Sequence, residues 1–329
     1  MVASANYVGN WARKMNRLRD ANMPLVTGFD TGCPILQYPN ANLNTQTTVN
    51  TFTSAGCAPS GQHAFLELAT NDGNADYNAL QLSLRRQMSK SISFDLGYTF
   101  SHGLADYTDN LTGGAFPQNS YNYATEMSNS VLDIRSRFVG SFIWQLPFGQ
   151  GKRYLSDNGA ASRWLGDWQF NGIVTLQTGT PYSVTAANDG LLGFTHSVYA
   201  DCVGNPFAGA TSNHNLYTTS GFMINPAAFA QPGPGEFGTC APYKFYGPGI
   251  QMYDLSLFKQ FKFTERFQLQ FRAEFFNAFN HPNFANPSAN IASPGSFGKV
   301  SSTLQPILGT DSGGPGDPRE IQFGLKLYF

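Results

Sequence analysis

Apolar and polar residues alternate along several short segments of the chain, most regularly over the last eleven residues, 319–329. One face of this segment carries apolar side chains, those of Ile321, Phe323, Leu325, Leu327 and Phe329. The other face carries Glu320, Gln322, Gly324, Lys326 and Tyr328. Successive side chains of a β-strand point to opposite faces, and a strand of about 9 to 11 residues crosses a bilayer. The pattern therefore predicts a membrane-spanning strand, although a soluble sandwich can also end on an alternating strand.

Seven further segments alternate in the same way. They are residues 2–8, 77–87, 92–100, 138–146, 168–178, 252–263 and 267–275. Only a few residues separate the second segment from the third, and the sixth from the seventh, which predicts two tight hairpins. Lys259 lies on the apolar face of its segment. We expect its ammonium group to snorkel to the membrane interface.

The connections between these segments differ in length. The long ones are residues 9–76, 102–136, 180–249 and 278–318. Bacterial outer-membrane barrels have long extracellular loops and short periplasmic turns, and they end on the periplasmic side. Counting back from Phe329 places every long connection outside. The sequence thus predicts an all-β, antiparallel transmembrane β-barrel segment of about eight strands in a single domain over residues 1–329.

Composition agrees with this prediction. Charged residues make up only 12% of the chain, whereas aromatic residues make up 14%. This combination suits lipid-facing strands with aromatic girdles. The formal net charge of −1 gives no indication of a nucleic-acid or anionic partner. No apolar run of about 18 residues occurs, so a helical membrane span is not predicted.

The first twenty residues, MVASANYVGNWARKMNRLRD, lack the apolar core and cleavage site of a secretory signal. An outer-membrane protein needs such a signal to leave the cytoplasm. Either the barrel prediction is wrong, or the chain is the carboxy-terminal part of a longer protein. We favour the second interpretation, because residues 2–8 look like the end of a strand cut through its middle.

The cysteines are Cys33, Cys57, Cys202 and Cys240, and all lie in Gly-, Pro- and Asn-rich stretches between predicted strands. They form no Cys-x-x-Cys pair or Cys/His cluster, which argues against zinc. An even number of cysteines in loops is typical of disulfides in an oxidising compartment. Of the three possible connectivities, the simplest is local: Cys33 with Cys57, and Cys202 with Cys240. Four free thiols are the alternative.

Several short strings resemble sites in unrelated proteins. FDTGC (29–33) and TDSGG (310–314) contain the Asp-Thr/Ser-Gly of aspartic proteases, and DSGGP resembles the nucleophile loop of chymotrypsin-like enzymes. Only 18 residues follow Asp311, and no histidine lies in a recognisable base motif. Asp72, Asn74 and Asp76 alternate like calcium ligands but lack the Gly and distal Glu of an EF-hand. We interpret all of these strings as turns, and no metal or cofactor is predicted.

One block of sequence resembles a known family. YGPGIQMYDLSLFKQFKFTERFQLQFRAEFFNAFNHPNF (246–284), with NPAAFA (225–230) and the terminal DPREIQFGLKLYF, is similar to the end of TonB-dependent outer-membrane receptors of the Oar-like group found in acidobacteria. YNALQLSLRRQMSKSISFDLGYTFSHGLAD (77–106) and DIRSRFVGSFIWQLPFG (133–149) resemble earlier strands of the same barrel. Members carry an amino-terminal carboxypeptidase-regulatory-like domain, a plug and a 22-stranded barrel. This chain corresponds to about the last third of that barrel and lacks the other two domains.

The resemblance implies a set of partners. Ile321, Phe323, Leu325 and Leu327 would face outer-membrane lipid, and Phe329 resembles the aromatic signal read by the barrel-insertion machinery. The remaining barrel strands and the plug of the same receptor would complete the wall and the gate. TonB would act only through the plug, on an unidentified solute. Arg272 and Glu274 would point into the lumen, toward solute or plug, with a structural charge ladder as the alternative.

Two other functions remain open from the sequence. The first is a self-standing barrel of eight strands used for adhesion or interaction. The second is an outer-membrane hydrolase that uses loop carboxylates such as Asp72, Asp106 and Asp109. We expect the chain to be a receptor part and not an enzyme. We do not expect it to transport a solute alone, because the plug is missing.

Overall fold

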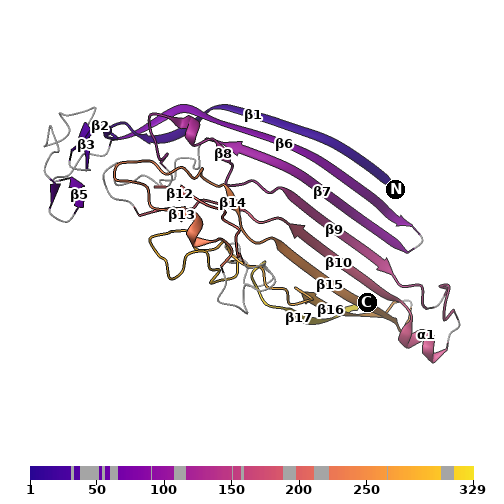
Figure 1. The fold of residues 1–329 in the computed structure, drawn as a ribbon. Helices are drawn as coiled ribbons and strands as arrows, with labels where there is room; N and C mark the ends of the chain where they lie inside the picture. The colour runs from indigo at the N-terminus through magenta and orange to yellow at the C-terminus, as the bar shows by residue number, and fades with distance from the viewer. Residues whose placement is uncertain are drawn as a thin grey trace.

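The computed structural model describes residues 1–30, 33–37, 52–53, 56–59, 66–89, 91–106, 116–149, 151–156, 159–187, 198–210, 222–264, 266–304 and 315–329. Within these residues, eight long strands form one antiparallel sheet (Figure 1). They are β1 (Val2–Asp20), β6 (Glu67–Ser89), β7 (Ile92–Ala105), β9 (Ser136–Gln145), β10 (Trp168–Gln177), β15 (Ile250–Lys262), β16 (Gln268–Phe276) and β17 (Glu320–Tyr328). The short strand β8 (Ser128–Asn129) pairs with the end of β7.

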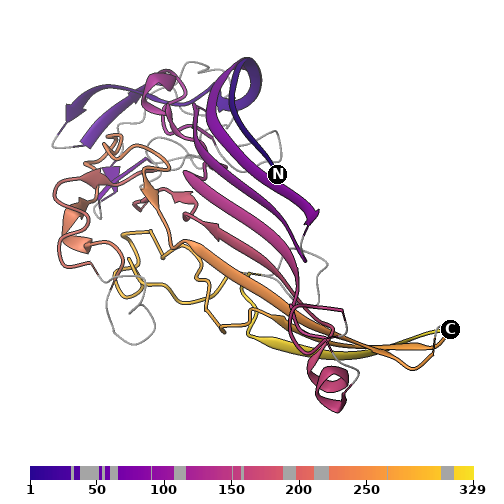
Figure 2. The ribbon, with the colours of Figure 1, turned by 90° about the vertical axis from the view of Figure 1, so that its right-hand side faces the viewer.

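The long strands are joined as a meander. Consecutive long strands pair with one another, in the order β1-β6-β7-β9-β10-β15-β16-β17. The all-β antiparallel fold and the number of long strands therefore agree with the sequence prediction. Among the described residues, β1 and β17 have a partner on one side only, so the sheet is open. Figure 2 shows the curved sheet with the loops gathered beyond one end of the strands.

The first two long strands extend beyond their predicted bounds. β1 continues past residue 8 to Asp20, and β6 begins at Glu67 and not at residue 77. The added part is mostly polar on both faces, and Arg13 pairs there with Asp76. Alternation marks a strand only where one face is apolar, so the prediction of one loop over residues 9–76 was wrong. At about 3.3 Å per residue, the 23 residues of β6 reach well beyond a hydrocarbon layer of about 30 Å.

Register sorts the side chains into an apolar and a polar face. One row of the apolar face consists of Phe94, Phe142, Gly172, Leu255, Phe275 and Ile321. The adjacent row of the polar face consists of Ser93, Ile143, Asn171, Ser256, Glu274 and Gln322. The ring of Phe142 lies over Gly172, where a Cβ would approach the ring to 2.5 Å. Glycine at this position therefore leaves the space that the ring occupies.

The two ends of the sheet differ (Figure 1). Both termini and the helix α1 (Ala160–Leu165) lie at one end, here called the turn end. The other end, here called the loop end, carries small two-stranded sheets. They are β2 (Leu25–Asp30) with β3 (Cys33–Gln37), β4 (Phe52–Thr53) with β5 (Gly56–Pro59), β11 (Pro181–Tyr182) with β14 (Phe245–Tyr246), and β12 (Asp201–Cys202) with β13 (Phe229–Ala230). The single-turn helices η2 (Tyr123–Thr125) and η4 (Pro226–Ala228) also belong to connections at this end.

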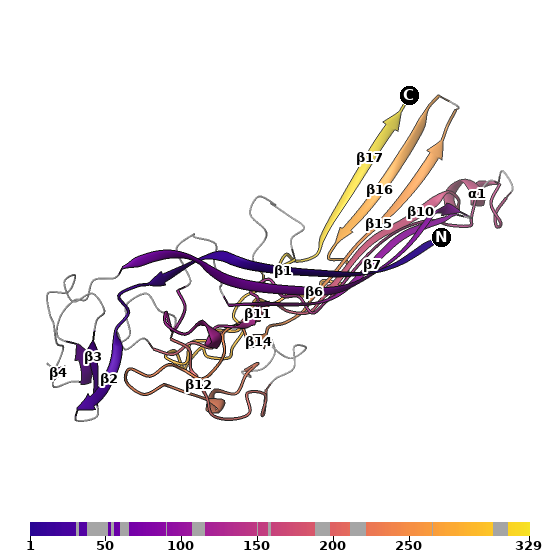
Figure 3. The same cartoon turned by 90° about the horizontal axis from the view of Figure 1, so that it is seen from above.

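Seen from above, β15, β16 and β17 run at a clear angle to β1 and β6 (Figure 3). Adjacent strands of a sheet rotate by about 20 to 25° relative to one another, and this twist accumulates across the sheet. No helix in the described part of the chain is long and apolar enough to cross a membrane.

A buried apolar cluster, here called the loop core, lies in the connections at the loop end. It consists of Tyr182, Val184, Ala186, Ala200, Ile224, Ala228, Phe229, Cys240, Phe245 and Phe297. The ring of Phe245 lies at its centre, with centroid distances of 5.5 Å to Phe229 and 6.1 Å to Tyr182. The connection between β10 and β15 is therefore a packed unit, to which Phe297 adds a ring from the connection between β16 and β17.

Candidate functional site

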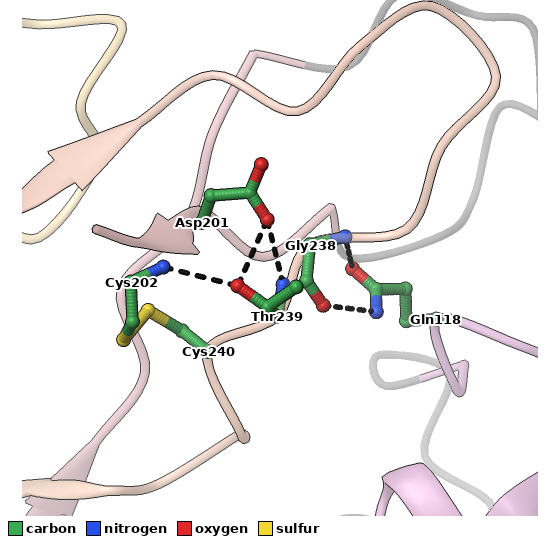
Figure 4. Close-up of a disulfide and its surroundings, with 6 residues drawn as sticks. All are labelled: Gln118, Asp201, Cys202, Gly238, Thr239 and Cys240. Carbon is green, nitrogen blue, oxygen red and sulfur yellow. Dashed lines mark hydrogen bonds between the residues drawn. A yellow bond between two sulfur atoms is a disulfide. The ribbon is translucent and has the colours of Figure 1, made fainter.

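A disulfide fixes one part of the loop core. Cys202, in β12, is bonded to Cys240, and their Cα atoms are 5.1 Å apart. Next to it, the carboxylate of Asp201 accepts hydrogen bonds from the backbone N–H and the hydroxyl of Thr239, at 3.0 and 2.9 Å (Figure 4). The Thr239 hydroxyl also accepts from the Cys202 N–H at 3.2 Å. This is the local pairing that the sequence suggested for these cysteines.

The other predicted pair is described only in part. Cys33 is disulfide-bonded. The side chain of its expected partner, Cys57, lies outside the part of the chain that the structure describes. The Cys33–Cys57 pairing therefore stays a prediction.

Gln118 joins two connections at the loop end into one unit. Its Oε1 accepts from the Gly238 N–H at 3.0 Å, and its Nε2 donates to the Gly238 carbonyl at 3.1 Å (Figure 4). The same Oε1 accepts from the Tyr199 N–H at 3.0 Å. A Cβ on Gly238 would lie 1.9 Å from the Tyr199 oxygen, so only glycine allows this approach. The connection between β7 and β9 is thereby fixed to the disulfide-bonded connection between β10 and β15.

Glu126 lies at the same junction with 5% of its surface exposed. Its Oε1 accepts from the Gln118 N–H at 2.8 Å. Burial raises the pKa of this carboxyl above its ordinary value, because the charged form loses hydration. Hydrogen bonds from Gln118, Asn119 and Tyr199 lower the pKa but do not offset the effect of burial. The group therefore binds a proton more strongly in the folded loops than in water.

A second junction involves Asp133 and Tyr246. Asp133 accepts from the Gly103 N–H at 2.6 Å and lies 3.2 Å from Arg135 Nε. The Tyr246 hydroxyl donates to the same carboxylate and accepts from Arg135 Nε at 2.9 Å. Burial, followed by the hydrogen bond to Asp133, raises the pKa of Tyr246 to about 12. The junction attaches β14 of the loop core to the ends of β7 and β9.

A cavity of about 1170 Å³ lies at the loop end, against the apolar face of the sheet. Register places Tyr98, Phe138 and Leu176 side by side in its sheet wall. Residues of the connection between β16 and β17 also line the cavity, including Phe279, His281, Phe284 and Asp317. This lining of rings, amides and few charges suits an amphiphilic molecule.

Two of the candidate hydrolase carboxylates are held by one arginine. Arg17 is almost fully buried, and its guanidinium lies 2.8 Å from Asp106 Oδ1 and 3.0 Å from Asp72 Oδ1. The same guanidinium lies 3.8 Å from the centre of the Tyr123 ring. The N–H and Nδ2 of Asn74 donate to the two Asp106 oxygens at 2.7 and 2.9 Å. These contacts join β1, β6 and β7 and engage both carboxylates, whereas Asp109 lies outside the described residues.

The calcium-like string is not a turn, as the sequence suggested, but part of β6. Asp76 pairs with Arg13, and Asp72 with Arg17. In the described part of the chain, no group of His, Cys, Asp or Glu side chains is arranged to hold a metal ion. Residues 31–32 and 310–314 of the protease-like strings lie outside the described residues.

The predicted lumen residues lie on the polar face. Glu274 pairs with Ser256 and Gln322 in the register, and Arg272 pairs with Phe258 and Gly324. The Nε of Arg272 donates to Gln270 Oε1 at 2.8 Å, and its guanidinium lies 4.9 Å from the centre of the Phe258 ring. Both side chains are half-buried. Their role toward a solute or a plug stays a prediction.

The terminal strand presents its apolar residues away from the rest of the protein. Ile321, Phe323, Leu325 and Leu327 are exposed and pair with residues of β16, and Phe329 follows the end of β17. Leu325 has 71% of its surface exposed. Such residues need an apolar environment that the chain itself does not supply.

Lys259 is placed differently from the prediction. It does not snorkel to the surface but is 1% exposed, beneath the segment that contains α1. Its Nζ donates to the Gly166 carbonyl and lies 5.1 Å from the centre of the Phe261 ring.

Sequence reasoning also missed Arg17, Gln118 and Glu126. Each makes contacts across tens of residues, and no local pattern indicates such partners.

The open meander with one apolar and one polar face defines the protein as a membrane β-barrel wall, with loops packed at one end. A family model, Outer membrane beta barrel domain, matches residues 1–322. The chain belongs to this family, and the protein is therefore located in the outer membrane. The loop end is then extracellular and the turn end periplasmic, as barrels of this kind are oriented. No curated protein matches the chain by sequence.

Proposed function

We propose that the chain is part of the barrel wall of a TonB-dependent receptor of the Oar-like type, which imports an unidentified solute. The observation that carries this proposal is the open sheet, in which, over the residues that the structure describes, β1 and β17 each pair on one side only. Unpaired backbone groups are costly in lipid. Further strands of a larger barrel would pair with both edges, and the polar face would then line a lumen wide enough for a plug.

The edge strands also differ in length. β1 has 19 residues and β17 has 9, so direct closure would leave much of β1 unpaired. An eight-stranded barrel has an interior just wide enough to be filled by its side chains. The polar face here carries Asn171, Ser256 and Glu274, which suit contact with water, solute or plug. Arg272 would extend the same lumen surface.

The packed extracellular connections supply the second argument. The loop core and the two polar junctions hold several connections in one arrangement above the wall. Loops held in this way are suited to ligand capture. Outer-membrane lipid would contact the apolar face, the insertion machinery would recognise Phe329, and TonB would act through the plug alone.

Edge pairing is tested by cross-linking. Ser4 lies on the polar face of β1, opposite Ser83. Ser4→Cys is combined in turn with Gly324→Cys, Lys326→Cys or Tyr328→Cys on the polar face of β17, and the protein is oxidised in its native membrane. The receptor proposal predicts no cross-link within one chain. A cross-link in any pair would show a closed barrel of eight strands and contradict the proposal. Ser4→Cys with Ser83→Cys is the positive control, because these hydroxyls are 2.7 Å apart.

Transport is tested by solute depletion. Strains that lack this protein, or the inner-membrane complex that energises TonB, should fail to deplete the same solute from the medium, as followed by mass spectrometry. Restoring the gene should restore depletion. Unchanged depletion in the first strain would contradict the import function.

Adhesion by a self-standing barrel is the second candidate, favoured by the independent core of the extracellular connections. It predicts the β1–β17 cross-link and loss of surface attachment without a depletion defect. A hydrolase has less support, because Asp72 and Asp106 are both engaged by Arg17. We therefore propose a transport role and not a catalytic one.

A further inference from the structure

The periplasmic connection between β9 and β10 carries a cluster of exposed aromatic and basic residues. Trp164 and Leu165 of α1 have 66% and 61% of their surfaces exposed, and Phe148 and Tyr154 are also exposed. The guanidinium of Arg153 lies 5.4 Å from the centre of the Tyr154 ring. Exposed aromatic rings beside basic side chains are typical of segments that lie in a membrane interface.

This cluster is continuous with the lipid-facing surface of the barrel wall. The rings of Trp164 and Phe261 are edge-on, with their centroids 5.8 Å apart. The backbone carbonyl of Trp164 accepts a hydrogen bond from the Trp168 indole N–H at 3.3 Å. Trp168 pairs with Lys259, and Lys259 with Phe271, in one row of the apolar face. α1 therefore lies against the outside of the wall and not in the lumen.

The segment that contains α1 covers Lys259, a cation on the apolar face of the wall. An ammonium group facing lipid is costly near the midplane and less so toward the interface. Here the Lys259 Nζ donates to Gly166 at the end of the helix and is screened from outside. The segment thus supplies a hydrogen-bond acceptor to the Lys259 ammonium group on the apolar face. The same segment leaves Trp164 and Leu165 exposed on its outer side.

We propose that α1 is an interfacial anchor, which lies in the inner leaflet of the outer membrane with Trp164 and Leu165 inserted among phospholipids. The partner is phospholipid at the boundary between headgroups and acyl chains. Arg153 and Arg163 are exposed in the same connection, and Arg163 lies in the last turn of α1. Their guanidinium groups would meet headgroup phosphates, as basic residues near a membrane surface do. The anchor does not depend on what the barrel transports.

The depth of Trp164 is measured by fluorescence quenching. The protein, purified from its native membrane, is placed in phosphatidylcholine vesicles brominated either near the headgroup or near the chain ends. The difference in emission between wild type and Trp164→Phe isolates this one ring. It should fall about twofold with shallow bromine and less with deep bromine, because interfacial helices lie about 5–10 Å into the boundary. Trp144→Phe, which removes an exposed ring of the lipid face, is the positive control.

Equal emission with and without bromine, or stronger quenching by deep bromine, would overturn the proposal. Acetylation of lysines by a membrane-permeant reagent gives a second measurement. Lys259 should be unreactive in wild type and at least about tenfold more reactive in Trp164→Ala/Leu165→Ala. Loss of the anchor would move the segment away from Lys259 and break its hydrogen bond to the Gly166 carbonyl. An unreactive Lys259 in an inserted double variant would contradict the shielding role.

Discussion

The barrel wall and the loop core place apolar residues in opposite ways. On β17, the side chains of Phe323 and Leu325 are exposed, whereas in the loop core Val184, Ile224 and Phe297 are buried. The wall is one layer of strands and relies on lipid to cover its apolar face. The loop core lies outside the membrane and has to bury its apolar surface within the chain. The two regions should therefore respond differently to the same kind of substitution.

The largest difference is expected for a charge on the lipid face. Leu325→Arg places a cation where it costs roughly 2 to 4 kcal/mol at mid-membrane, and it should abolish insertion. Gln322→Arg, on the polar face of the same strand, should be tolerated. The amount of each variant in the outer-membrane fraction measures the effect. If both assembled equally well, the assignment of the two faces would be wrong.

Deletion of Phe329 should slow assembly without changing the sheet.

A cavity in the loop core should affect the loops alone. Phe245→Ala removes the central ring and should destabilise the unit by about 3 to 5 kcal/mol, with insertion unchanged. Hydrogen exchange of peptides from residues 182–187 and 222–246 measures the loss of protection. Phe207→Ala is the matched control, because that ring is 6.4 Å from Phe245 but is itself exposed. Loss of insertion in Phe245→Ala would mean that the loops and the wall fold as one unit.

Removal of the disulfide should give a somewhat smaller effect. The bond between Cys202 and Cys240 closes a loop with a sequence separation of 38, and disulfides of this kind contribute about 2 to 4 kcal/mol. Cys202→Ala/Cys240→Ala should increase proteolysis of the extracellular loops in intact cells and leave β17 inserted. Recovery of both thiols in free form from the native membrane would contradict the disulfide itself.

The smallest effect concerns pH. The pKa of Glu126 is raised in the folded loops, so the folded state binds this proton more tightly than the unfolded state. The stability of the loops is therefore greatest while the carboxyl is protonated, and it decreases as pH rises through the window above the ordinary value of 4.5. Glu126→Gln should abolish this decrease, as measured by the thermal midpoint of loop proteolysis across that window. Glu236→Gln, at an exposed carboxyl of the neighbouring connection, is the control, and an unchanged pH profile in Glu126→Gln would contradict the assignment.

The success of sequence reasoning followed the same division. Strands β9, β10, β15, β16 and β17 were predicted to within about two residues, since lipid on one side and water on the other impose alternation residue by residue. The start of β7 was also predicted, but the strand continues to Ala105, five residues beyond its predicted end. The parts of β1 and β6 nearest the loop end were missed because both of their faces are mostly polar. The packed loop core was predicted only as a long connection. Its residues come from several connections, and their contacts depend on tertiary packing.

The sequence by itself determined the all-β class, the number of long strands, which end carries the loops and which residues of β17 face outward. Each of these properties follows from a local period of two and from the lengths of connections. Only the tertiary structure decided that Arg17 engages Asp72 and Asp106, that Gln118 joins two connections, and that Lys259 lies beneath α1. Such contacts join residues up to 120 positions apart. Their geometry is set by the register of the sheet and the packing of its connections, which no short stretch of sequence contains.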